Sequence, residues 1–96
     1  MAEAYVENTV SGYAVSLGWR HRKVKWVGRD GAPDRLYFRK GDRPFFIEYK
    51  DEGEPVKPHQ AREHKELREQ GVEVFVVDNV EDGMAIFDAK GPKKKK

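Results

Sequence analysis

The sequence contains no cysteine, so neither a disulfide framework nor a thiolate metal site is possible. Any metal ion must therefore bind oxygen or histidine ligands. No apolar run is long enough to span a bilayer, and the N-terminus lacks the basic segment and apolar stretch of a signal peptide. We therefore expect a soluble, cytoplasmic protein without a membrane partner.

The charge is uneven along the chain, although the formal net charge is only +2. Residues 20–43 contain nine Lys or Arg residues and three acids, a local charge of +6. Residues 51–88 contain four bases and eleven acids, a local charge of −7. This pattern is typical of a molecule with one basic face suited to a polyanion and one acidic, solvated face. Charge blocks that serve only solubility give the same pattern, so charge alone leaves both interpretations open.

With 96 residues, the chain has the size of one small domain. Apolar residues at three- and four-residue steps predict a helix over residues 3–17, which ends at Gly18. The alternation over residues 22–27 predicts a strand with a basic outer face. Residues 35–39 and 44–50 predict two further strands that form an antiparallel hairpin.

The second half of the sequence predicts a helix over about residues 58–70 and a strand over residues 72–77, buried on both faces. A weak apolar element follows at residues 84–87. The order helix, three strands, helix, strand indicates an α/β fold with a central mixed sheet flanked by helices. We expect residues 1–90 to form the domain and residues 91–96 to be a disordered basic tail.

The strand over residues 44–50 has an unusual composition for a central strand. Alternation places Glu48 and Lys50 on one face and Phe45, Ile47 and Tyr49 on the other. A buried ion pair gives little net stability, because desolvating both charges costs about as much as their attraction returns. Function is therefore the better explanation for this acid and amine.

Asp34 begins the adjacent strand, so the hairpin should bring it close to Glu48. Two carboxylates with open coordination positions suit Mg²⁺, which prefers oxygen ligands and retains several waters. Lys50 beside them can orient water or stabilise charge that develops on a phosphate. A structural hairpin with a cross-strand ion pair is the alternative interpretation.

These residues carry a family resemblance. Pro33-Asp34 followed by Glu48-Tyr49-Lys50 resembles the PD-(D/E)xK signature of the restriction-endonuclease-like nuclease superfamily. A wider set of residues resembles the virus-type replication-repair nuclease (VRR-NUC) domain over roughly residues 3–88. This set comprises Gly31 to Arg35, Phe46 to Lys50, Gln60, Leu67 and Gly71 to Val74.

The resemblance implies a restriction-endonuclease-like core and a role for each matching residue. Asp34, Glu48 and the backbone carbonyl of Tyr49 would bind Mg²⁺ or Mn²⁺, and Lys50 would be the catalytic lysine. No organic cofactor is expected. The same resemblance favours a stand-alone, phage-type enzyme that acts in the host cytoplasm.

Two further residues join the site by resemblance. Glu7 is the candidate for the acid of the first helix, which would complete the metal site directly or through water, and Glu3 one turn earlier is the alternative. An exposed acid near a helix N-terminus is a common structural feature that would also explain either residue. Gln60 would project from the second helix toward Lys50 or the phosphate.

The expected activity is that of a metal-dependent, structure-specific DNA endonuclease, similar to Holliday junction resolvases that act as homodimers on four-way junctions. A nuclease for flaps, nicks or linear duplex and a non-catalytic DNA-binding module are the alternatives. The presence of Asp34, Glu48 and Lys50 together argues against the non-catalytic module. We expect basic residues around the catalytic hairpin to contact DNA phosphates, namely Arg20, Arg22, Lys23, Lys25, Arg29 and Arg35.

The remaining candidates are histidines and aromatic residues. His21, His59 and His64 fall on different expected elements, so we predict surface residues rather than a histidine metal site. Trp26 is expected in the core with Val24, and a subunit contact is the alternative.

Overall fold

The computed structural model describes residues 2–93, which form helices and strands in the order α-β-β-β-α-β-α. The elements are α1 (Ala2–Ser16), β1 (Arg20–Lys23), β2 (Arg35–Phe38), β3 (Phe45–Tyr49), α2 (Pro58–Glu69), β4 (Val74–Val77) and α3 (Val80–Lys90). The predicted order is therefore confirmed and extended by α3. None of the helices in this part of the chain has the length and apolar character that a membrane span requires.

The four strands form one mixed sheet in the order β1-β2-β3-β4. The pairs β1–β2 and β2–β3 are antiparallel, and the pair β3–β4 is parallel. The predicted hairpin is confirmed, with Arg35 opposite Ile47. A parallel pair needs a long crossover connection, which α2 provides.

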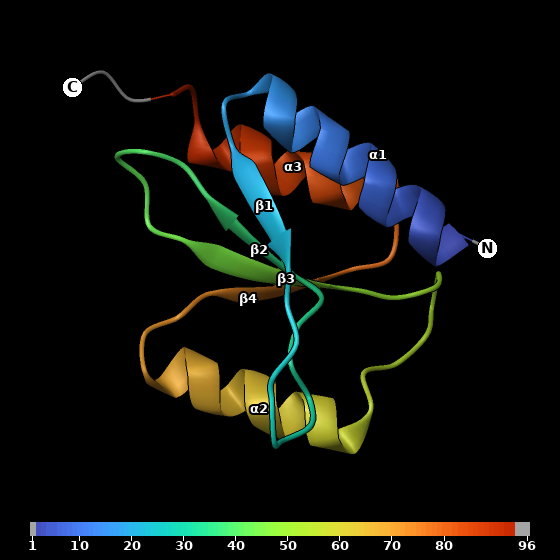
Figure 1. Cartoon of the computed structure of the whole chain (residues 1–96). Coiled ribbons are helices and arrows are strands. Elements are labelled where there is room, and N and C mark those ends of the chain that lie inside the picture. Colours follow the sequence, from blue (N-terminus) through green and yellow to red (C-terminus); the bar gives the residue numbers. More distant parts are fainter. Residues whose placement is uncertain (1, 94–96) are drawn as a thin grey trace.

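The helices cover both faces of the sheet, with α1 and α3 on one side and α2 on the other (Figure 1). In α1, Val6, Val10 and Ala14 are spaced by four residues and form a buried stripe that faces the core. Helix α3 packs closely on α1 at Gly83, where an added Cβ would lie 2.5 Å from Cγ2 of Val10. The glycine therefore sets how near the two helices approach.

The main core lies between the sheet and the α1/α3 layer and is largely aromatic. Tyr37, Phe45, Tyr49 and Phe87 are fully buried, and Trp19 is nearly so. The ring of Phe45 contacts those of Trp19, Tyr37 and Phe87 at centroid distances of 5.3 to 5.7 Å. Burying a large apolar side chain contributes about 1.5–3 kcal/mol, so this face of β3 supplies much of the stability of the sheet.

The predicted strand over residues 22–27 is wrong in its position, because β1 ends at Lys23. Among the described residues, strand β1 pairs only with β2, which begins at Arg35 opposite Lys23, and no described strand extends the sheet beyond this point. The chain instead forms a loop over residues 24–34 that reaches toward α2 (Figure 1). Trp26 is therefore not in the main core. It lies half-buried in this loop, with its ring against Phe46.

Helix α2 lies where it was predicted, whereas strand β4 differs from its prediction. In α2, Ala61 is exposed, and the buried residues of the helix are the polar Glu63 and His64. Strand β4 is an edge strand, and Val76 is 42% exposed on it, so β4 is not buried on both faces. The covering helix contacts the sheet mainly through polar side chains.

The start of the predicted tail is held against the body of the protein. Arg39 is 4% exposed, and its Nη2 donates to the backbone carbonyl oxygens of Gly91 and Pro92 at 3.1 and 3.3 Å. Its Nε also donates to Asp42 Oδ2 at 2.8 Å. Residues 94–96 of the predicted tail lie outside the described residues, and the domain boundary at residue 90 stays a prediction.

Candidate active site

Asp34 lies at the end of the loop over residues 24–34, immediately before β2. Its Oδ2 accepts a hydrogen bond from the backbone N–H of Tyr49 at 2.7 Å, and its backbone carbonyl accepts one from Val24 N–H at 3.0 Å. The carboxylate is therefore fixed against the end of β3. The predicted approach of Asp34 to the Glu48 strand is present in the structure.

Glu48 and Lys50 point to the face of β3 that α2 covers, opposite the aromatic core. Glu48 is 2% exposed and Lys50 is 5% exposed. The Nζ atom of Lys50 lies 3.6 Å from Oε2 of Glu48. Lys50 follows the last residue of β3, and its backbone N–H donates to the carbonyl of Val77, which continues the pairing with β4. The strand geometry thus places an acid and an amine together in a nearly buried position.

The surroundings of both carboxyl groups disfavour negative charge in the absence of a cation. Burial and, after it, the neighbouring charge of Asp34 together raise the pKa of Glu48 to about 7, against the opposing effect of Lys50. Burial also raises the pKa of Asp34, although the hydrogen bond from the Tyr49 N–H opposes this. A cation between these groups would relieve the unfavourable charge.

Gln60 connects α2 to Glu48. Its Nε2 donates to Oε2 of Glu48 at 2.9 Å, and its Oε1 accepts from the backbone N–H of Lys57 at 3.0 Å. The second bond fixes the orientation of the amide and satisfies a backbone donor at the start of α2, where Lys57 provides no side-chain cap. Gln60 therefore contacts Glu48 directly, whereas the sequence predicted that it would point toward Lys50 or the phosphate.

Glu7 is buried but is not hydrogen-bonded to the two central carboxylates. Its Oε2 accepts hydrogen bonds from Lys23 Nζ at 2.8 Å and from Arg35 Nε at 2.6 Å. Burial alone would raise the pKa of Glu7, but the bonds from Lys23 and Arg35 outweigh it and hold the pKa below its usual value. The charge of Glu7 still acts on Asp34, whose pKa it raises.

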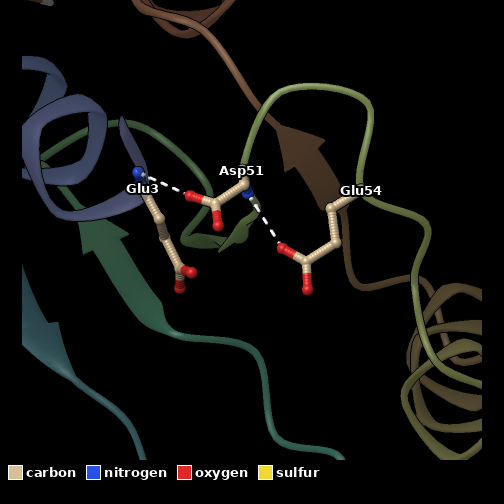
Figure 2. Close-up of side chains that lie close together, drawn as sticks. All are labelled: Glu3, Asp51 and Glu54. Carbon is tan, nitrogen blue, oxygen red and sulfur yellow. Dashed lines mark hydrogen bonds between the residues drawn. The ribbon is translucent and has the colours of Figure 1, made fainter. Parts of the chain in front are cut away.

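Glu3, the alternative to Glu7, belongs to a group of acids beside the site. Carboxylate oxygens of Glu3, Asp51 and Glu54 lie within 4.8 Å of one another (Figure 2). The backbone N–H of Glu3 donates to Asp51, and that of Asp51 donates to Glu54, both at 3.0 Å. Glu3, Glu7 and Asp51 line the same open hollow of about 240 Å³. Both helix-one acids thus face one depression next to the central carboxylates.

The six predicted DNA-binding residues differ in how available they are. Arg20, Arg22 and Lys25 are exposed. The side chains of Lys23 and Arg29 are 64% and 65% exposed, although each pairs with an acid, Glu7 and Glu63 respectively. The side chain of Arg35 is only 17% exposed, since it is bonded to Glu7 and to Nδ1 of His21. Arg35 is therefore the least accessible to DNA.

His64 is the site residue that the sequence did not predict, and its expected surface location is wrong. It is 1% exposed, and its Nε2 lies 4.0 Å from Oε1 of Glu48. Burial lowers the pKa of His64, and the charges of Arg68 and Lys50 lower it further, so the ring is neutral near neutral pH. One signal was available: His64 follows Gln60 by four residues, which places both on one face of α2. His59 is exposed and His21 is half-buried away from Glu48.

The donor set fits a hard divalent cation. Asp34 and Glu48 supply carboxylate oxygens, and Oε1 of Glu48 is buried without a hydrogen-bond partner among the described residues. An orphaned carboxylate oxygen is costly in a folded protein, and it is the ligand type that Mg²⁺ and Mn²⁺ prefer. The nearby acids Glu3 and Glu7 add further negative potential.

The chain is similar to a phage protein and to a solved domain structure. It is 42% identical over 77 residues to the protein named "Putative nuclease p44" from Acyrthosiphon pisum secondary endosymbiont phage 1, a match that covers 76% of this chain and 83% of that protein. A solved structure described as a VRR_NUC domain superposes with a TM-score of 0.85 at 34% sequence identity, over 92% of this chain and 96% of that one. No family model matches the chain.

Proposed function

Because the chain belongs to the VRR_NUC family of nucleases, with its restriction-endonuclease-like fold, we propose that it is a divalent-metal-dependent DNA endonuclease that cuts branched DNA as a homodimer. The observation that carries the proposal is the environment of Glu48. A carboxylate that is 2% exposed lies beside a buried lysine, and its pKa is raised by burial and by Asp34. One of its oxygens has no hydrogen-bond partner among the described residues. A structural ion pair does not need such an arrangement.

In this proposal, Asp34 and Glu48 hold Mg²⁺ or Mn²⁺ together with the backbone carbonyl of Tyr49. When bound, the cation polarises the phosphate and lowers the pKa of water so that hydroxide is available at neutral pH. Lys50 supplies positive charge that stabilises the negative charge developing on the phosphate. Gln60 holds the carboxylate of Glu48 in place through its 2.9 Å hydrogen bond.

Glu7 has a different part in the proposal. Its two bonds hold Lys23 and Arg35 beside the site, and of these two side chains the exposed Lys23 faces the phosphate backbone. Glu7 acts on the metal only through its charge or through water. Arg20, Arg22 and Lys25 extend this basic surface, and Lys23 and Arg29 remain exposed enough to join it. Contacts of this kind give affinity with little sequence specificity.

Two parts of the proposal, the preference for branched DNA and the homodimeric state, rest on the analogy with junction-resolving nucleases. A two-fold symmetric junction needs two matched cuts, which a symmetric dimer can make. The test is a cleavage panel of end-labelled four-way junction, flap, nicked and linear duplexes, with Mg²⁺, Mn²⁺ or EDTA. We expect paired, symmetric nicks in the junction and no cleavage in EDTA. The mass of the protein in solution, with and without the junction, tests the dimer.

Two variants and one control assign the site. Glu48→Ala should abolish cleavage, and Lys50→Ala should reduce its rate by a factor on the order of 10²–10³, as loss of one transition-state donor does. Glu81→Ala, at an exposed position on α3, is the control and should cleave normally. Preferential cleavage of flaps or linear duplex would show that branched DNA is not the preferred substrate. Binding of DNA without any cleavage would favour a non-catalytic module.

A further inference from the structure

Two buried polar atoms face each other in the site without a hydrogen-bond partner among the described residues. They are Oε1 of Glu48 and Nε2 of His64, which lie 4.0 Å apart. The two residues are 2% and 1% exposed. Leaving a buried donor or acceptor unsatisfied costs about 1–3 kcal/mol, so two such atoms side by side indicate a hydrogen bond that a small movement would complete.

The other oxygen of the same carboxylate is already held by α2. Gln60 donates to Oε2 of Glu48 at 2.9 Å, and His64 lies one helical turn farther along the same face. The two side chains therefore straddle the carboxylate, one at each oxygen. A donor at each oxygen fixes the plane of a carboxylate, whereas a single donor leaves it free to rotate about that bond.

We propose that His64 is a positioning residue for Glu48, whose Nε2–H donates to Oε1 and, together with Gln60, fixes the carboxylate in the orientation that binds the divalent cation. The inference rests on the proposed metal-dependent function and deepens it. Shortening the 4.0 Å distance between Nε2 of His64 and Oε1 of Glu48 to hydrogen-bond length needs a movement of roughly 1 Å. Hydrogen bonds to the ligands of a metal ion typically change metal affinity by about 10–100-fold.

The test compares His64→Gln with His64→Met. The glutamine amide nitrogen reaches about as far as Nε2 of the imidazole and can donate, whereas methionine has a similar length and shape but no donor. Binding of Mn²⁺ to each protein is measured by titration calorimetry without DNA, so the readout does not depend on catalysis. We expect His64→Met to bind Mn²⁺ about 10-fold more weakly than the wild type or worse, and His64→Gln to stay within about threefold of it.

Controls separate this role from simple packing. His59→Met changes an exposed residue on the same helix and should leave Mn²⁺ binding unchanged. Urea unfolding midpoints show whether each variant is folded. Normal Mn²⁺ binding by His64→Met, or equal weakening in the Met and Gln variants, would overturn the positioning role. Absence of Mn²⁺ binding in the wild type would instead overturn the proposed metal-dependent function and this inference with it.

A measurement on the wild type keeps the inference testable even if the variants do not fold. Long-range ¹⁵N–¹H correlation spectra of the imidazole, recorded with and without Mg²⁺, identify which ring nitrogen carries the proton. The inference requires the proton on Nε2 of His64 in the Mg²⁺-bound protein. A proton on Nδ1 in that state would leave Nε2 unable to donate to Glu48, and the inference would be wrong.

Discussion

Replacing Glu48 with glutamine should make the metal-free protein more stable at about pH 8 but leave it nearly unchanged at about pH 5. Burial and the neighbouring charge of Asp34 raise the pKa of Glu48 from its ordinary value of 4.5 to about 7. The folded protein therefore holds this proton more tightly than the unfolded chain does. The stability that protonation contributes is fully present below pH 4.5 and is lost as the pH rises to about 7.

The size of the effect follows from the two pKa values of Glu48. A tenfold change in proton affinity is worth about 1.36 kcal/mol, so a rise from 4.5 to about 7 corresponds to about 3 kcal/mol. Roughly 2 kcal/mol of this falls between pH 5 and pH 8. Because the side chain is 2% exposed, solvent screening does not reduce the figure much. Glutamine resembles the protonated acid in shape and carries no charge, so it avoids this loss.

The assay is urea unfolding of the wild type and Glu48→Gln at both pH values in EDTA. The free energy of unfolding of the variant minus that of the wild type should increase by about 2 kcal/mol from the lower to the higher pH. Adding Mg²⁺ at the higher pH should stabilise the wild type and not the variant, because only the wild type keeps both carboxylates. If the difference between the two proteins is the same at both pH values, Glu48 ionises normally and our account of its environment is wrong.

Two pairs of glycine substitutions test the backbone that positions the site. Gly31 and Gly28 both have positive φ, but an added Cβ lies 2.8 Å from a backbone carbonyl oxygen of α2 at Gly31 and meets nothing within 4 Å at Gly28. Both alanine variants should therefore lose about 1 kcal/mol to backbone strain. Only Gly31→Ala should also lower the cleavage rate, because it displaces the loop that ends at Asp34, a proposed metal ligand. In the helices, Gly83→Ala should destabilise the protein by about 1–3 kcal/mol, because its Cβ would lie 2.5 Å from Val10. Gly12→Ala should stabilise it by about 0.5–1 kcal/mol, because an added Cβ there meets nothing within 4 Å. Equal urea unfolding midpoints for the two variants would contradict the packing of α1 on α3.

The parts of the fold that the sequence predicted correctly are those in which one local pattern determines one contact. The spacing of Val6, Val10 and Ala14 predicts α1, and these residues are buried in the core. The alternation over residues 44–50 predicts a strand with Phe45, Ile47 and Tyr49 on one face, and these residues are buried in the core on β3. In each case the period of the pattern and the direction of the core agree, so no distant part of the chain is needed to decide the structure.

The predictions were wrong where a partner that is distant in the sequence determines the structure. Strand β1 ends at Lys23 because β2, with which it pairs, begins at Arg35, and this cannot be read from the alternation over residues 22–27. Helix α2 has too few apolar residues to predict which side it buries. Its buried residues are the polar Glu63 and His64, since their partners lie on the loop over residues 24–34 and on β3. Both partners come from other parts of the sequence.

The candidate site shows the same division. Asp34, Glu48 and Lys50 could be placed together because one hairpin holds all three. The partners of Glu7 and the direction of the Gln60 side chain could not be predicted, because each depends on how a helix is oriented against the sheet. Family resemblance identified those two residues without giving the contacts they make.

Helix α2 makes polar contacts both with β3, which carries Glu48, and with the loop that ends at Asp34. Gln60 and His64 face Glu48 on β3, while Glu63 accepts hydrogen bonds from Trp26 and Arg29 on the loop that ends at Asp34. The bond from Trp26 Nε1 to Glu63 is 2.6 Å long, and Glu63 is 8% exposed.

Because α2 has little apolar surface with which to bind the sheet, these bonds are a substantial part of what determines its position. The distance between the carboxylates of Asp34 and Glu48 thus depends on one helix that is itself held by contacts in the candidate site. The polar composition of α2, which weakens the prediction of its buried face, is therefore what allows it to align Asp34 with Glu48.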